Sequence, residues 1–155
     1  MPTKKILTKF KNFFLQFFLI DDTTHKIAAG AALGVFWGIM PGEGIGTTLL
    51  TSTLLRFNRF SATASVIATN TWTTFFILPL AATAGGFFFK INAENLIKDF
   101  KNTYHLGIKY FFTEEIFARI LLPLLTGFFI ISLLISLFVY FSLYILLKYR
   151  KIRFK

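Results

Sequence analysis

Long apolar blocks with polar or glycine-rich breaks dominate the pattern of hydrophobic and polar positions in this chain. The first block covers residues 27–55 and contains Pro-Gly-Glu-Gly at 41–44. Its two halves are apolar on all sides, which is typical of helices buried in protein or lipid. Irregular backbone at membrane depth is tolerated only where protein or a wet cavity satisfies its polar groups. The pattern therefore predicts a re-entrant hairpin, in which two half-helices meet at a non-helical tip.

Two further apolar blocks complete the predicted membrane core. One covers residues 61–89 and holds a polar cluster at 70–74, and the other covers residues 118–147 with Arg119 as its only charge. About 20 apolar residues suffice to cross a bilayer, so each block is long enough to span it. We expect an all-α membrane protein with a re-entrant helical hairpin, about two transmembrane helices and two amphipathic interfacial helices.

The interfacial helices are predicted from apolar residues that recur at three- and four-residue spacing. Near the start of the chain, apolar residues from Ile6 to Phe18 alternate with lysines, which is typical of a helix on a membrane surface. A cleaved signal peptide fits less well, because no small-residue cleavage site follows. Later, Asn92 is placed to cap a helix whose apolar stripe runs from Leu96 to Phe111.

These patterns divide the chain into five parts, each with one character. They are an amphipathic basic N-terminal helix and turn (1–24), a membrane core with the broken hairpin (25–89), an amphipathic interfacial segment (90–117), a transmembrane helix (118–147) and a basic tail (148–155).

Composition and charge favour a membrane location. Charged residues make up 15% of the 155 residues, whereas globular proteins carry about 25%, and the mean hydropathy is +0.64. The net charge of +10 comes from lysines and arginines that flank the apolar blocks. This placement fits anionic lipid headgroups better than nucleic acid. The absence of cysteine excludes disulfides and thiolate metal sites.

The positive-inside rule predicts the orientation. Both ends of the chain and the break at Arg56 and Arg59 are basic, while segment 90–117 is close to neutral. We therefore expect a multi-pass protein of the cytoplasmic membrane with both termini cytoplasmic, in which residues 61–89 cross once. In the alternative, residues 61–89 form a second re-entrant hairpin with its tip at 70–74, which places the basic tail outside.

Glu43 is the sharpest candidate for chemistry. It is the only acidic residue within the first two apolar blocks, and an ionisable group at membrane depth is costly and therefore a functional hypothesis. It would bind a cation or a proton, or pair with Arg56 or Arg59. The alternative is a wet turn at the far surface, in which Glu43 is solvated.

The other candidate residues are polar groups and glycines near the breaks. The hydroxyl and amide groups of residues 70–74 either line a polar cavity or make ordinary helix–helix hydrogen bonds. The arginines at 56 and 59 either hold a lipid phosphate or only set the topology. Glycines four residues apart let another helix approach closely, or they line a ligand groove. The predicted substrate- or ion-binding residues are Glu43, Asn70, Thr73, Thr74, Arg56 and Asn58; the hairpin break is Pro41, Gly42 and Gly44; the packing glycines are Gly30, Gly34 and Gly38.

No residue pattern typical of an enzyme or a metal site is present in the sequence. The two histidines, His25 and His105, are far apart, and neither an HExxH nor a GxSxG motif occurs. We therefore expect no catalytic activity, no cofactor and no metal.

Three motifs stand out within residues 25–89: Gly34-x-Phe36-x-Gly38-x-x-Pro41-x-x-Gly44, then Leu55-Arg56-Phe57-Asn58, then Asn70 with Thr73. On these motifs the segment resembles the bacterial family called domain of unknown function 2062. The family usually has Asn-Pro where this chain has Asn70-Thr71, so the proline kink is missing here. The resemblance implies a small bacterial integral membrane protein and supplies no established activity.

Broken helices present unpaired backbone groups to a substrate in transporters. We therefore expect a transporter-like or lipid-translocating protein of the bacterial cytoplasmic membrane. The alternative is a non-catalytic membrane subunit or scaffold whose amphipathic ends recruit partners. The expected partners are membrane lipids, with anionic headgroups at the basic termini, and a second copy or another membrane protein; nucleic acid is not expected.

Overall fold

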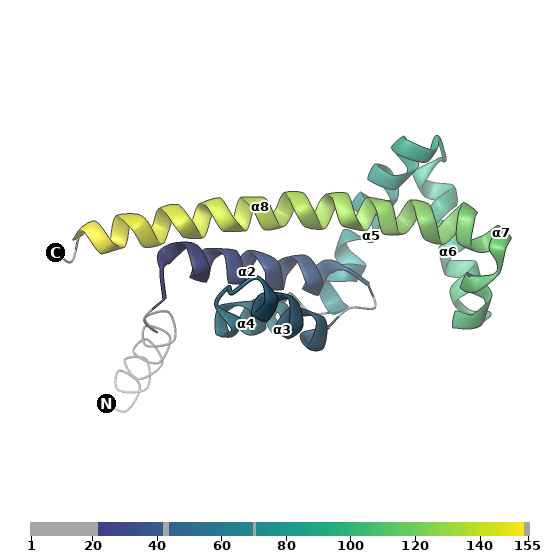
Figure 1. Cartoon of the computed structure of the whole chain (residues 1–155). Coiled ribbons are helices and arrows are strands. Elements are labelled where there is room, and N and C mark those ends of the chain that lie inside the picture. The colour runs from purple at the N-terminus through teal and green to yellow at the C-terminus, as the bar shows by residue number, and fades with distance from the viewer. Residues whose placement is uncertain (1–21, 42–43, 70, 154–155) are drawn as a thin grey trace, which may run out of the picture.

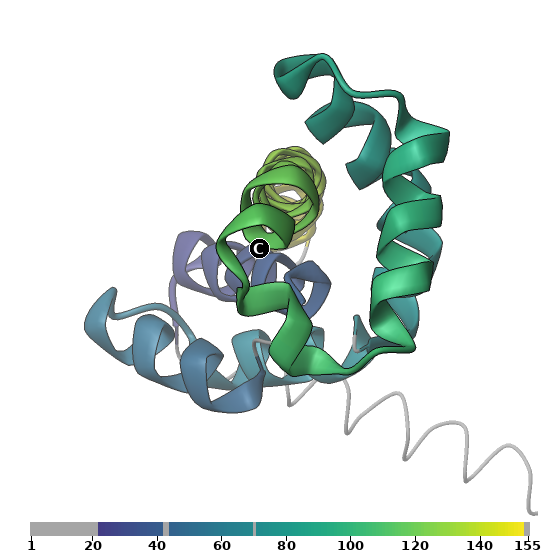
Figure 2. The same cartoon turned by 90° about the vertical axis from the view of Figure 1, so that its right-hand side faces the viewer.

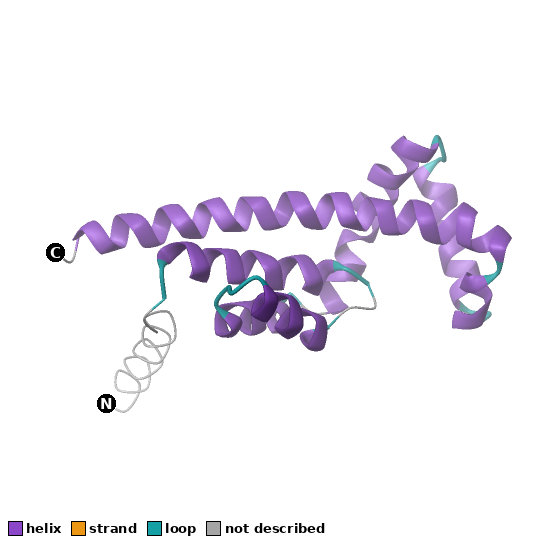
Figure 3. Cartoon of the chain, in the orientation of Figure 1, coloured by secondary structure: helices purple, strands orange, loops and turns teal. Residues whose placement is uncertain are grey.

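The computed structural model describes residues 22–41, 44–69 and 71–153, and this part of the chain contains helices and no strands. Short loops join the helices (Figure 3). The predicted all-α class is confirmed for these residues, whereas the surface helix expected within residues 1–24 falls almost wholly outside them. The helices are α2 (Thr24–Ile39), α3 (Ile45–Leu54), α4 (Arg59–Ala68), α5 (Thr71–Phe89), α6 (Ala93–Tyr104) and α8 (Leu122–Arg153), with the short helices η1 (Ile108–Phe112), α7 (Glu114–Ile116) and η2 (Phe117–Leu121) before α8.

The longest helix, α8, packs against α2 and α5, while α3 and α4 pack on the α2 side and α6 packs on α5 (Figure 1). Its 32 residues give a length of about 48 Å at about 1.5 Å per residue. α2 lies antiparallel to the middle of α8: the rings of Phe36 and Phe129 are 5.7 Å apart, and a hydrogen bond of 2.9 Å joins His25 Nδ1 to the Tyr140 hydroxyl. The start of α2 and the basic end of α8 therefore lie at the same end of the molecule (Figure 1).

α5 crosses α8 towards the opposite end, and the two backbones approach closely there. A Cβ atom at Gly85 would collide with the Pro123 carbonyl, and one at Gly127 would collide with the Ala81 carbonyl. Small residues permit such an approach between helices. α6 then folds back along α5 and stands beside α8 when the molecule is viewed along that helix (Figure 2).

The three glycines of α2 lie against α4. A Cβ atom at Gly34 would collide with the Ala62 carbonyl and come within 2.8 Å of Ser65 Cβ. A Cβ atom at Gly30 would likewise collide with the Asn58 carbonyl, and one at Gly38 with the Thr69 side chain. Because Gly30, Gly34 and Gly38 meet successively later residues of the second helix, α2 and α4 run in the same direction, with α3 returning the chain between them.

Asn58 connects the start of α4 to the start of α2. Its side chain accepts a hydrogen bond from the Ser61 N–H (2.7 Å) and donates one to Asp22 Oδ2 (3.0 Å). Its backbone N–H donates to the Lys26 carbonyl at 3.1 Å. The residue is buried, so it acts as a helix N-cap and as a link between two helices.

Replacing Asn58 with Ala should lower the free energy of unfolding by about 1–2 kcal/mol, because the cap and the bond to Asp22 are both lost. Asn92 supplies a matched control, since it caps α6 through the Glu94 N–H (2.8 Å) but is exposed. Asn92→Ala should cost about 0.5 kcal/mol. Thermal unfolding of both variants in detergent measures the difference, and equal shifts of the midpoint would contradict the linking role of Asn58.

The apolar stripe predicted from Leu96 to Phe111 does not lie on a single helix. α6 ends at Tyr104, and Gly107 then adopts a φ of 103°, in the left-handed region that glycine enters without a steric penalty. The prediction of one continuous helix is therefore wrong, although Leu96 and Phe111 are both buried in the same core. The predicted N-cap at Asn92 is confirmed.

The apolar block over residues 61–89 is divided between α4 and α5 near residues 69–70 without a proline. From this break α5 continues to its crossing with α8 at Gly85, away from the end that holds His25. The chain therefore does not return to the end where α4 began, as a second re-entrant hairpin would require. The packing of α5 on α8 is the physical reason.

One helical segment of the described residues, Glu114–Tyr149, is long and apolar enough to cross a membrane. Phe75–Phe89 and Ala93–Tyr104 meet the same requirement only as a pair, and they are bent by 115° relative to each other. By length and composition, the described residues therefore contain one helix that could cross a membrane. A second crossing is possible only if the bent pair of helices forms a single span.

Candidate functional site

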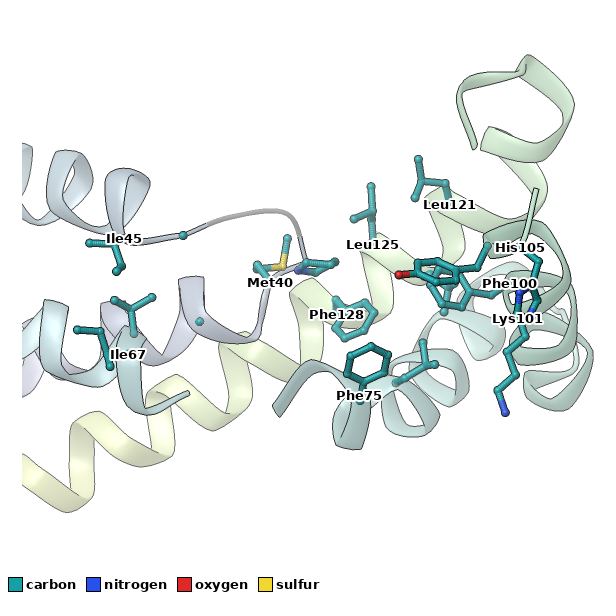
Figure 4. Close-up of a pocket in the computed structure, with 17 residues that line it drawn as sticks. Met40, Ile45, Ile67, Phe75, Phe100, Lys101, His105, Leu121, Leu125 and Phe128 are labelled. Atoms are coloured by element: carbon teal, nitrogen blue, oxygen red, sulfur yellow. The ribbon is translucent and has the colours of Figure 1, made fainter. Parts of the chain in front are cut away.

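A cavity of about 740 Å³ lies between the tip of the α2–α3 pair and the layer of α5, α6 and the start of α8 (Figure 4). All six long helices contribute to its wall. The lining residues are Gly38, Met40 and Pro41; Gly44 and Ile45; Val66 and Ile67; Phe75 and Leu78; Phe100, Lys101, Tyr104 and His105; and Leu121, Leu124, Leu125 and Phe128.

The two ends of the cavity differ in chemistry. Ile45 and Ile67 lie at one end, and Lys101 and His105 lie at the other (Figure 4). Apart from Tyr104, the other side chains of the wall are apolar, with Leu125 from α8 near the middle (Figure 4). The cavity therefore suits an elongated ligand with one apolar end and one polar end.

The connection between α2 and α3, which is the first of the two predicted breaks, borders this cavity. α2 ends at Ile39 and α3 begins at Ile45, and Pro41 and Gly44 of the connection both line the wall. Gly44 stands at the N-cap of α3 and forms no side-chain capping hydrogen bond. Gly42 and Glu43 lie outside the described residues.

The second break, between α4 and α5, is described only in part. Asn70 and the side chain of Thr74 lie outside the described residues, and Thr73 is half-buried in the first turn of α5. Phe75, one turn into α5, lines the cavity together with Pro41. The backbone after the second break and the backbone of the first break therefore border one space.

Arg56 and Asn58 do not belong to this space, so the predicted grouping of these residues with the break is corrected. They precede α4 next to Lys26, at the opposite end of α2, whose 16 residues measure about 24 Å. The side chain of Asn58 already makes hydrogen bonds to the Ser61 N–H and to Asp22. Arg56 is exposed, with a φ of 56°. A ten-residue helix, α3, separates these residues from the break.

Sequence reasoning missed the polar residues of α6 that line the cavity. Lys101 and His105 are four residues apart and therefore share a helix face. From the sequence alone, this face is interpreted as the solvent-exposed side of a surface helix. The fold of α6 against α5 brings this face to the cavity. No local signal distinguishes it from an ordinary exposed face.

The opposite face of α6 borders a smaller hollow of about 390 Å³. Asp99 and Asn102 of α6 line it together with Glu115 and Arg119, whose side chains form an exposed ion pair of 3.8 Å. Within the described ranges, no three His, Asp or Glu side chains lie close enough together to hold a metal ion.

A family model described as an uncharacterized protein conserved in bacteria (DUF2062) matches residues 7–155 of this chain. No curated protein and no solved structure matches. The match extends well beyond residues 25–89, on which the resemblance in sequence motifs rests, and it includes α6 and α8. The chain therefore belongs to this bacterial family, the domain of unknown function 2062.

Proposed function

We propose that this protein is an integral protein of the bacterial cytoplasmic membrane that binds a membrane lipid in its cavity. It acts as a lipid-translocating or transporter-like protein and catalyses no reaction. The observation that carries the proposal is the cavity of about 740 Å³, which lies beside a helix break and has apolar walls and one polar end. Ligand pockets have volumes of about 300–1,000 Å³.

The outer surface supports a location in lipid. Large apolar side chains cover the outer faces of α3, α5 and α8; Phe76 and Phe87 are each 81% exposed, and Phe138 is 74% exposed. Water-soluble monomers rarely expose large apolar patches. A bilayer would cover the surface without requiring a protein partner.

The distribution of charge supports the predicted orientation. Lys26, Arg56, Arg59 and Lys148 lie at the end of the molecule marked by the His25–Tyr140 contact. From Leu121 to Tyr140 the chain advances about 29 Å, close to the roughly 30 Å of a bilayer core. The positive-inside rule puts the basic end in the cytoplasm, and α6 would then lie near the outer surface.

Photocrosslinking tests the lipid-binding proposal. Protein in liposomes that contain a phospholipid with a diazirine on its acyl chain should crosslink at residues 121–128 more than on the outer face of α8. Leu125→Trp fills the cavity and should remove these crosslinks. Leu134→Trp, on the exposed face of the same helix, should leave them unchanged.

Crosslinks that are spread evenly over the outer faces and unaffected by Leu125→Trp would contradict a lipid site in the cavity. A fluorescent-lipid assay on the same liposomes then separates the two functions. Lipid translocation by the pure protein supports a translocator. A native complex with a stoichiometric second protein, and no translocation, would instead support a membrane subunit or scaffold.

A further inference from the structure

We infer that the cavity selects an anionic lipid and holds its headgroup at the α6 end through Lys101 and His105. This inference rests on the lipid-binding function proposed above and adds the charge and the direction of the ligand. The alkyl chain would extend towards Ile45 and Ile67, at the opposite end of the cavity (Figure 4).

The first support is the separation of charge across α6. Lys101 and His105 line the cavity, and no described residue of its wall is acidic. Asp99, only two residues before Lys101, borders the other hollow together with Glu115. Lys101 and His105 therefore stand at the α6 end of the cavity, with the Lys101 side chain extending towards its outer edge (Figure 4), and the Asp99 carboxylate borders the opposite hollow. This separation of charge is the complement that an anionic headgroup requires.

The second support is the exposure of the polar end of the cavity to solvent. Lys101 and His105 are both exposed to solvent, so a headgroup bound there would keep part of its water shell. Lys101 forms no ion pair with another described residue. Its ammonium can therefore bind a phosphate without first losing a carboxylate partner among these residues. The imidazole of His105 can donate a second hydrogen bond.

The third support is the position of these residues along the proposed span. α6 follows the apolar helix α5 and is itself amphipathic, with Leu96 buried and Lys98 exposed. A helix of this kind lies at the boundary between headgroups and acyl chains. The cationic end of the cavity would then be level with the headgroups, and the apolar end would lie deeper among the chains.

Titration of the purified full-length protein in a non-ionic detergent tests the inference. The probes are two lysolipids with the same oleoyl chain, lysophosphatidylglycerol (anionic) and lysophosphatidylcholine (zwitterionic), and native mass spectrometry measures their affinities. The anionic lipid should bind roughly tenfold more tightly, which is the scale of one hydrogen bond to a charged group. Lys101→Gln should abolish this preference, and Lys101→Arg should retain it.

Lys98→Gln is the matched control, because it removes the same charge from the same helix at a position outside both hollows. It should leave the preference intact. An equal loss in Lys98→Gln and Lys101→Gln would show only diffuse attraction to a basic surface and would overturn the inference. Equal binding of both lipids to the unchanged protein would overturn the headgroup assignment but leave the lipid site standing. Binding of neither lipid would overturn both proposals.

Discussion

Replacing Gly34 with Leu should remove almost all folded protein from the membrane fraction. Even a Cβ atom at this position would collide with the Ala62 carbonyl and approach Ser65 Cβ to 2.8 Å. The obstacle is mainly backbone, which cannot change rotamer to make room. Overpacking in a core costs about 1–3 kcal/mol where neighbours can adjust, and here two helices must separate. Solubilised protein that elutes as a single species in size-exclusion chromatography measures the loss.

Gly46→Leu is the control for this substitution. Gly46 lies in α3, and a Cβ atom there would have no atom within 4 Å. Leucine favours a helix over glycine by roughly 0.8 kcal/mol, so this variant should accumulate at least as well as the unchanged protein. If both variants were lost to the same extent, added bulk in the apolar block would be the cause, and the α2–α4 contact would not explain the result.

A cysteine at Asn102 should react in intact cells with a thiol reagent that cannot cross the membrane, and a cysteine at Lys148 should not. Both side chains are exposed in the structure, so the membrane alone decides which one reacts. Asn102 belongs to α6, and Lys148 lies near the basic end of α8, with the apolar length of α8 between them. The chain has no cysteine of its own, so each variant carries one label.

Lysed cells supply the reference for this experiment, because both cysteines should then react. Reaction of the Lys148→Cys variant in intact cells, with Asn102→Cys protected, would reverse the proposed orientation. Reaction of both variants in intact cells would place the two positions on one side and would contradict a span formed by α8.

The first break illustrates what local chemistry can predict. The sequence indicates helices on either side of residues 41–44, and the structure ends α2 at Ile39 and begins α3 at Ile45. Proline and glycine act on the backbone of their immediate neighbours, so their effect does not depend on the rest of the fold. The side-chain caps at Asn58 and Asn92 operate over two or three residues for the same reason.

The division between α4 and α5 shows where local rules stop. No proline marks residues 69–70, and the polar cluster at 70–74 leaves open whether residues 61–89 cross once or turn back. The contact of Gly38 with Thr69 and the crossing of Gly85 over α8 set the course of these helices. Both contacts join residues more than 30 positions apart, and a local pattern does not encode them.

Sequence alone therefore predicted the all-helical class found in the described residues, the strongly apolar character, the basic ends and the break between α2 and α3, because composition, periodicity and the Pro-Gly pair act locally. The tertiary structure decided which polar groups share a site. It separated Arg56 and Asn58 from the break by the length of α2 and brought Lys101 and His105 to the cavity. The physical reason is that the cavity wall comes from all six long helices, whose positions follow from close contacts between residues distant in sequence.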